Sequence, residues 1–341
     1  MKNQESQIIE KALELGYESC GIIDISEMTG FADVLKKRIE KAPGNEGMYG
    51  GFYSFANLQE RYHWAKSLVV CVISYGHYSI PEHLDGVIGK HYLVDVRSNE
   101  DCSEYITSIK FEEYLRTLGL EVETERRFGI TAMRWAADKA GLGIVRRNNF
   151  FYTESGSWVH IEAFLTDADM EKKGDYIGKP CPPDCNRCIS LCPTKSLSEP
   201  NTMSPATCVS PLTVRGDDQM ENPIYRKMGR WVYGCDTCQD VCPFNEGKWA
   251  GTAKFPGLSE LAGEISLESI VTISEERLIE LLASKFFYID RARIVQWKVN
   301  ALGAMLNDYR TDYAKTINAA KNDPNERVSE MAKWVAGELS L

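Results

Sequence analysis

The hydrophobic positions of the first half of the chain alternate between helical and strand-like patterns. Helical spacing of apolar residues occurs in three segments, residues 6–16, 101–118 and 131–140. Three apolar runs rich in β-branched residues are typical of strands, residues 19–24, 67–75 and 158–166. Because strands alternate with helices, the pattern predicts an α/β (α+β layered) domain over residues 1–172, and the run at 67–75 is long enough for a strand buried on both faces.

The second half of the chain shows two other patterns. Residues 173–250 have little periodicity and hold most of the cysteines, which is typical of a segment that folds around metal centres. Residues 251–341 are predicted to be helical, with polar joints between four segments: 275–283, 292–303, 312–320 and 326–336. Paired short helices of this kind resemble HEAT repeats, which act either as a packing cap or as a concave binding surface.

Seven of the eleven cysteines form two runs, each closing on Cys-Pro, and an eighth, Cys208, lies between the runs. A thiolate run of this kind is typical of two-cluster ferredoxins, in which the last cysteine of each run binds the other cluster. The pattern predicts a bacterial-ferredoxin-like domain with two [4Fe–4S] clusters. The expected ligands are Cys181, Cys185, Cys188 and Cys242 for the first cluster, and Cys192, Cys208, Cys235 and Cys238 for the second.

Other interpretations of the cysteines are zinc sites, disulfides and buried thiols. Zinc also binds paired Cys-x-x-Cys motifs but does not require Cys-Pro at the end of both runs. Disulfides require an oxidising compartment. Three residues separate Cys181 from Cys185, where the commoner ferredoxin spacing has two, and this leaves open whether Cys181 is the first ligand. The remaining three, Cys20, Cys71 and Cys102, are expected to be small buried hydrophobic residues.

The composition is that of an ordinary globular protein, with 43% hydrophobic and 26% charged residues among 341. No apolar run approaches the ~20 residues of a membrane span, and the polar start indicates no signal peptide. We therefore expect a cytoplasmic protein with no membrane partner. The net charge of −10 argues against a large nucleic-acid interface, so tRNA is not favoured as a partner.

The order of an α/β domain, a double cluster and a HEAT-like tail resembles the epoxyqueuosine reductase family and, more distantly, the reductive dehalogenases. Five segments carry the resemblance: residues 64–70, 140–143, 156–158, 208–213 and 233–243. The family consists of enzymes of tRNA modification that depend on cobalamin and [4Fe–4S] clusters. The resemblance implies an oxidoreductase with a cobalamin-binding domain of nitroreductase-like core at 1–172, the cluster domain at 173–250 and the HEAT-like domain at 251–341.

The resemblance also implies residues that hold a base-off cobalamin, one without a lower histidine ligand. They are Lys66, Gly129, Arg134, Gly141, Gly143, Asn148, Gly156, Ser157, Trp158, Ser210 and Thr213. The glycines would let the backbone approach the tail of the corrin. A helix stop or a tight turn explains each of these glycines equally well.

One departure from the family marks the chain as a divergent paralogue. Where the family has the aspartate presumed to donate a proton, this sequence has Arg127. An arginine side chain stays protonated at neutral pH and instead binds carboxylates or phosphates. Four arginines are candidates for one basic pocket, or alternatively for a solvated basic face: Arg126, Arg127, Arg146 and Arg147. We therefore expect an anionic small molecule or a modified nucleoside as the substrate.

Tyr75, His91 and Tyr92 are the other candidate catalytic residues. Tyr75 ends a predicted buried strand, where sites of α/β proteins usually lie, and a Tyr or His near the cofactor could supply a proton. A structural hydrogen bond is the alternative role for each. The clusters also imply an external electron donor of flavodoxin or ferredoxin type. A second hypothesis is an iron–sulfur electron-transfer protein or reductive activator without a substrate of its own.

Overall fold

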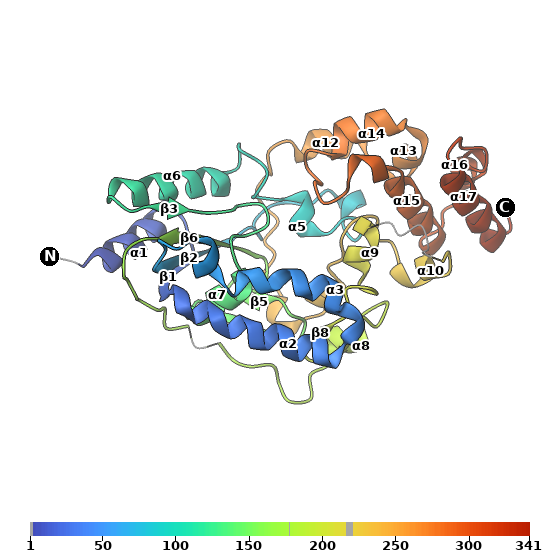
Figure 1. Ribbon diagram of the computed structural model, residues 1–341. Helices are drawn as coiled ribbons and strands as arrows, with labels where there is room; N and C mark the ends of the chain where they lie inside the picture. The colour runs from blue at the N-terminus through green and yellow to red at the C-terminus, as the bar shows by residue number, and fades with distance from the viewer. Residues whose placement is uncertain (1–2, 177, 216–220) are drawn as a thin grey trace.

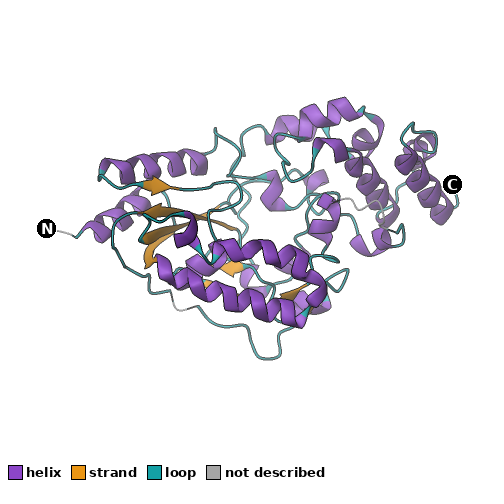
Figure 2. Ribbon diagram, in the orientation of Figure 1, coloured by secondary structure: helices purple, strands orange, loops and turns teal. Residues whose placement is uncertain are grey.

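The computed structural model describes residues 3–176, 178–215 and 221–341. The strands of the N-terminal half lie toward one end of the molecule, and the C-terminal helices gather at the other end (Figures 1 and 2). The cysteine-rich segment lies between the two halves of the chain in sequence and contacts both. Within the described residues, no helix has both the length and the apolar character needed to cross a membrane.

A four-stranded sheet forms the centre of the N-terminal half, in the order β1-β2-β6-β3. Its strands are β1 (Ser19–Asp24), β2 (Ser67–Ser74), β6 (Val159–Thr166) and β3 (Val122–Glu123). Every neighbouring pair is antiparallel, with Ser74 opposite Val159. The expectation that a site lies at strand carboxyl ends was drawn from parallel sheets and does not apply, because each edge of this sheet carries both strand starts and strand ends.

Helices cover both faces of this sheet, which explains why β2 reads as a continuous apolar run. Helices α1 (Gln4–Leu15) and α6 (Ser103–Thr117) pack on the face that includes Val69 and Cys71. Helix α7 (Met133–Lys139) packs on the other face with Val70. These helices and the three long strands match the predicted segments, and Gly16 ends α1 with a φ of 112°.

Helix α2 (Phe31–Lys41) was not predicted. Only Leu35 of this helix is buried, so the apolar signal in the sequence is weak. The remaining elements up to residue 245 are short. They are η1 (Ile25–Gly30), η2 (Pro43–Asn45), α3 (Glu46–Tyr49), η3 (Gly50–Phe55), α4 (Leu58–Arg61), η4 (Glu82–Leu84), α5 (Lys90–Leu93), β4 (Ile144–Val145), β5 (Phe151–Tyr152), α8 (Arg187–Ser190), β7 (Leu197–Glu199), β8 (Thr202–Met203), α9 (Val209–Arg215), α10 (Ile224–Met228), α11 (Thr237–Asp240) and η5 (Pro243–Asn245).

The C-terminal region is helical as predicted. Its elements are α12 (Leu258–Glu264), α13 (Leu267–Thr272), α14 (Glu275–Leu282), η6 (Arg291–Arg293), α15 (Val295–Asn307), α16 (Tyr313–Ala320) and α17 (Glu326–Leu339). Helix α15 is buried on nearly all sides, and Asn300 on it donates hydrogen bonds to the carbonyl oxygens of Thr213 and Val232. These bonds fasten the helix to the cysteine-rich segment.

One hydrophobic core runs through both predicted domain boundaries, near residues 172 and 250. It contains residues 75–102, part of the cysteine-rich segment and the C-terminal helices. The chain from Tyr75 to Cys102 therefore leaves the sheet and packs against elements that come more than a hundred residues later. This excursion brings the predicted catalytic residues next to the cysteine-rich segment.

Candidate functional site: two cysteine groups and an arginine cavity

The first cysteine group consists of Cys181, Cys185, Cys188 and Cys242, and it lines one narrow cavity. Helix α8 carries Cys188, and η5 follows Cys242 directly. Burial raises the pKa of Cys188, and the neighbouring thiols of Cys242, Cys181 and Cys185 raise it further. Cys181 lies with the other three despite its unusual spacing, so all four thiols face one space.

The second cysteine group consists of Cys192, Cys208, Cys235 and Cys238. Burial raises the pKa of Cys238, and Cys235 and Cys208 raise it further. Burial likewise raises the pKa of Cys208, with Cys192 adding to the shift. Such mutual shifts require the thiols to lie close together. Cys188 also acts on Cys238, so the two groups are neighbours.

The two groups have the chemistry of cluster ligands, because four thiolates around one space match a [4Fe–4S] cluster. Among the described residues, no three His, Cys, Asp or Glu side chains converge closely enough to hold a single metal ion. A [4Fe–4S] cubane differs from a single metal ion because its four cysteine ligands lie around a body several ångströms across. Cys20, Cys71 and Cys102 are buried elsewhere, as expected for hydrophobic packing.

Tyr75, His91 and Tyr92 lie together beside the second cysteine group. The ring centroids of Tyr75 and His91 are 5.4 Å apart, and those of His91 and Tyr92 are 5.5 Å apart. The Tyr92 hydroxyl lies 3.2 Å from the hydroxyl of Ser210, two residues after Cys208. The three predicted catalytic residues thus form one aromatic cluster, held against the cysteine-rich segment by short helix α5.

Burial sets the protonation states of the three side chains in the aromatic cluster. It lowers the pKa of His91 to about 3, and the nearby guanidinium of Arg97 acts in the same direction. It raises the pKa of Tyr92 to about 12 and the pKa of Tyr75 well above its usual value. His91 is therefore neutral at pH 7 and does not fit the predicted role of proton donor, whereas both tyrosines keep their protons.

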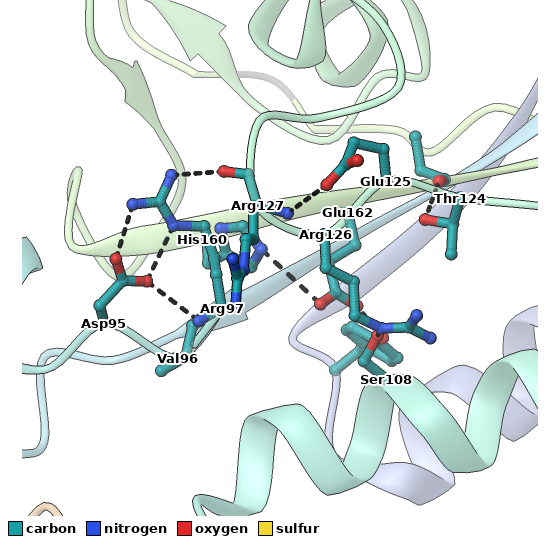
Figure 3. Close-up of polar contacts among 12 residues, drawn as sticks. Asp95, Val96, Arg97, Ser108, Thr124, Glu125, Arg126, Arg127, His160 and Glu162 are labelled. Atoms are coloured by element: carbon teal, nitrogen blue, oxygen red, sulfur yellow. Dashed lines mark hydrogen bonds and ion pairs between the residues drawn. The ribbon is translucent and has the colours of Figure 1, made fainter. Parts of the chain in front are cut away.

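Arg97 joins the aromatic cluster to Arg127. Its guanidinium lies between the carboxylate of Asp95, with donor distances of 2.8 and 2.6 Å, and the main-chain carbonyl of Arg127 at 2.8 Å (Figure 3). The same Nη1 atom donates to the Tyr288 hydroxyl. Burial alone would lower the pKa of Arg97 and raise that of Asp95, but their pairing reverses both shifts. Both groups are therefore charged.

Arg127 stands at the edge of an open cavity of about 280 Å³, here called the arginine cavity. Its lining residues are Arg97, Ser98, Glu100, Tyr105, Thr124, Glu125, Arg126 and Arg127. The Arg127 side chain is exposed, and its guanidinium lies 5.5 Å from the centre of the Phe287 ring. Within the described residues it forms no ion pair, which leaves it free to bind an anion.

The four arginines do not form one basic pocket. Arg126 lies at the arginine cavity but is neutralised by an ion pair with Glu112. Arg146 and Arg147 line the cavity of the first cysteine group instead, and Arg147 donates to the carbonyl oxygens of Cys185 and Pro183. The two arginine pairs lie at different cavities because the segment after α7 turns toward the cysteines.

The glycines proposed to approach a corrin are instead packed against protein. A Cβ atom on Gly141 would collide with the backbone of Gly174, and one on Gly143 would collide with Tyr152 and Phe151. Gly156 faces the side chain of Asn245. Gly141 and Gly156 also have positive φ angles of 69° and 77°. Turn geometry and close packing therefore explain these glycines, and the cofactor role predicted for them receives no support from the structure.

The other residues predicted to hold the cofactor also have protein partners. Lys66 is exposed at the start of β2, at the opposite end of the strand from the aromatic cluster. Gly129 faces Met133, and Arg134 donates to the carbonyl oxygen of Asn149. The remaining partners are Tyr152 and the Cys238 carbonyl for Asn148, Gln239 for Ser157, Trp249 for Trp158, Tyr92 for Ser210, and Gly234 for Thr213.

Three residues of the site escaped the sequence reasoning. Asp95 and Arg97 form the buried ion pair, and Tyr288 reaches them from the segment after α14. A charged pair two residues apart in an apolar stretch is a weak signal, because most such pairs are solvated. Tyr288 gave no local signal, since its partners lie about 190 residues away.

Comparisons with known proteins agree with this geometry. Residues 181–245 match the family model described as a 4Fe-4S double cluster binding domain. The epoxyqueuosine reductase of Cyclobacterium marinum is 28% identical over 256 residues, which cover 71% of this chain and 79% of the relative. That of Bacillus subtilis is 33% identical over 164 residues, covering 47% of this chain and 39% of the relative.

Solved structures show the same fold. The epoxyqueuosine reductase of Streptococcus thermophilus superposes with a TM-score of 0.77 over 99% of this chain and 90% of its own, at 20% identity. An epoxyqueuosine reductase solved with an epoxyqueuosine-modified tRNA-Tyr stem loop has a TM-score of 0.77 over 98% of this chain and 89% of its own, at 21% identity. With the sequence likeness and the double-cluster domain, these comparisons show that the chain is similar to epoxyqueuosine reductases, which are oxidoreductases, and shares their fold.

Proposed function

We propose that the protein is a reductase in which two [4Fe–4S] clusters deliver single electrons to a substrate site beside Tyr92. The first cysteine group would hold one cluster and the second group the other. The observation that carries this proposal is the contact between the second cysteine group and the aromatic cluster. Tyr92 reaches Ser210, and the backbone of Gly89 lies against that of Cys235.

The substrate proposed for this site is an anionic organic molecule. Arg127 offers an exposed guanidinium without an ion-pair partner among the described residues, at the edge of the arginine cavity. Guanidinium groups bind carboxylates and phosphates by two parallel hydrogen bonds. Asp95 forms an ion pair with Arg97, and Arg97 donates a hydrogen bond to the carbonyl oxygen of Arg127. The buried pair therefore sets the position of the backbone at Arg127.

The chain's own residues suggest how a proton would be held. His91 is neutral and Arg127 remains charged, so neither supplies a proton at neutral pH. The hydroxyl of Tyr92 keeps its proton and lies at the junction of the aromatic cluster and the second cysteine group. Tyr92 is therefore our candidate for the proton donor.

Base-off cobalamin is part of the proposal on the strength of the family likeness. When bound, it would supply a cobalt centre that reduces the substrate with electrons from the clusters. The residues expected to hold it do not form an open cradle, because the glycine faces and the polar side chains are occupied by protein. We assign no residue of this chain to the corrin. An external donor of flavodoxin or ferredoxin type and a cytoplasmic location complete the proposal.

The first test is anaerobic reconstitution with iron, sulfide and cobalamin, followed by desalting. The expected result is two reducible cubanes in the electron paramagnetic resonance spectrum, together with about one retained cobalamin that gives a base-off Co(II) signal. Retention of zinc in place of iron would overturn the cluster assignment. Formation of both clusters with loss of the cobalamin would overturn the corrin part of the proposal.

The second candidate function is electron transfer to a partner protein, without a substrate in the chain itself. The packed glycines favour it, because an electron carrier requires the clusters but no corrin. Loss of cobalamin on desalting, combined with rapid one-electron reduction by a reduced flavodoxin, is the outcome that would distinguish it from the reductase.

Epoxyqueuosine in tRNA is the alternative substrate, since one structural neighbour was solved with such a stem loop. Expression of the gene in queuosine-deficient cells tests this, with queuosine in tRNA as the readout. We expect no queuosine from the natural chain. The variant Arg127→Asp is the matched comparison, because it places an acid where the family has one. Queuosine formed by the natural chain would show that Arg127 does not exclude this substrate.

A further inference from the structure

A buried arginine faces the first cysteine group. Arg146 is only 4% exposed, and it follows strand β4 directly. Its guanidinium carbon lies 3.3 Å from the centre of the Phe244 ring and 5.1 Å from that of Tyr152. Its Nη1 atom lies 3.9 Å from the Sγ atom of Cys181. The guanidinium group thus lies over the Phe244 ring and near Tyr152, with Nη1 toward the sulfur atom of Cys181.

The charge of Arg146 is not neutralised by the protein. Among the described residues it has no carboxylate partner, and its buried Nε atom has no hydrogen-bond acceptor. A buried cation without a counter-ion is costly, because burial removes the water that would stabilise it. Such a group indicates that something negative occupies the cavity that it lines together with Cys181 and Cys188.

A [4Fe–4S] cluster with four thiolates supplies that negative charge. It is a dianion when oxidised and becomes a trianion when it takes up one electron, with no proton or bond exchanged. A fixed positive charge at the sulfur atoms favours the trianion over the dianion. The effect is large when the cation is buried, since solvent then screens it little.

We propose that Arg146 raises the reduction potential of the cluster bound by the first cysteine group and so sets its readiness to accept an electron. The inference rests on the cluster assignment proposed above and adds a residue that tunes one cluster and not the other. The second cysteine group differs in its surroundings, because Arg215, which acts on Cys208, is exposed, and the side chain of Asp236 lies close to Cys238.

Holoprotein with both clusters reconstituted provides the test. Reductive titration with dithionite, followed by electron paramagnetic resonance, gives the midpoint of each cluster. We expect Arg146→Met to make one midpoint more negative, by at least a tenfold change in the reduction equilibrium or about 59 mV for one electron. The other midpoint should stay unchanged. Arg146→Lys keeps the charge and should retain most of the natural potential.

Arg187→Met is the matched control. Arg187 lines the same cavity but is exposed, so solvent screens its charge and the same loss of charge should move the midpoint far less. Equal shifts for Arg146→Met and Arg187→Met, or unchanged midpoints in Arg146→Met with both clusters intact, would overturn the inference.

A measurement on the natural chain covers the case in which Arg146→Met fails to assemble its cluster. Protein labelled with ¹⁵N only in arginine is reduced, and pulsed electron paramagnetic resonance then detects nitrogen coupled to the cluster. Coupling from arginine ¹⁵N is expected to persist when Arg147→Lys and Arg187→Met remove the other two arginines of the cavity, and its absence would contradict the proposal. Iron and sulfide analysis of the same sample distinguishes a failure of this inference from a failure of the cluster assignment. A chain that does not bind two clusters would refute the cluster assignment instead.

Discussion

Asp95 and Arg97 form a two-point ion pair beneath Arg127, in which Nε donates to Oδ1 at 2.8 Å and Nη2 donates to Oδ2 at 2.6 Å. The two side chains are only 1% and 9% exposed. The remaining Nη1 atom of Arg97 holds the carbonyl oxygen of Arg127. A buried pair therefore sets the position of the backbone at Arg127.

Replacement of Asp95 by Asn should destabilise the protein strongly. It leaves the Arg97 charge buried without its partner, which costs about 3–5 kcal/mol in the free energy of unfolding. The shift of the urea midpoint measures this loss. The control is Glu264→Gln, which breaks the exposed pair with Arg277 and should cost less than about 1 kcal/mol. Similar losses in both variants would contradict the role of the buried pair.

The stability of the protein should fall as the pH drops below about 6.5, in part because of His91. Burial lowers the pKa of this histidine to about 3, so in the window between these values the unfolded chain binds a proton that the folded chain does not. Between pH 7.5 and 5.5 this group alone costs about 1.4 kcal/mol.

The variant His91→Phe removes this titration while it keeps an aromatic ring beside Tyr75. Its free energy of unfolding, measured by urea at both pH values, should fall less than that of the natural protein. An identical pH dependence in the two proteins would show that His91 binds its proton over the same pH range in the folded and the unfolded state, and would contradict the lowered pKa.

Gly141→Ala should destabilise the chain even when no cofactor is present. The φ of 69° already disfavours alanine, and the added Cβ would also collide with the backbone of Gly174. Gly86→Ala is the matched control, because its φ is 73° and the space before it is open. The left-handed conformation alone costs about 1–2 kcal/mol, and the collision should add at least about 1 kcal/mol.

Thermal unfolding of the two glycine variants, prepared without cobalamin, provides the measurement. If Gly141 served only to admit a cofactor, both variants would lose equal stability, and Gly141→Ala would differ from the control only in cobalamin binding.

Cys181→Ser should lose one of the two clusters despite the unusual spacing of this cysteine. The structure places its thiol in the same cavity as Cys185 and Cys242. Iron content after anaerobic reconstitution should fall from about eight to about four atoms per chain. Cys102→Ser changes a buried thiol that belongs to neither group and should keep the full iron content. Full occupancy in Cys181→Ser would exclude this residue as a ligand.

Local sequence patterns predicted many of the helices and strands. The strands at β1, β2 and β6 and the C-terminal helices follow from periodicity, because the side chains that repeat along each element are the ones it buries. The grouping of the cysteines was predictable from the two runs that end on Cys-Pro, because in two-cluster ferredoxins the last cysteine of each run binds the other cluster.

Tertiary structure decided the rest, because those features depend on contacts between distant segments. The antiparallel pairing of β2 with β6 joins residues about 90 apart, and no local pattern states the direction of a neighbour. The chain after Tyr75 packs against the C-terminal helices, which creates the buried pair of Asp95 and Arg97. Only the fold showed that Gly141 meets Gly174, and that Arg127 and Arg146, nineteen positions apart, serve two different sites.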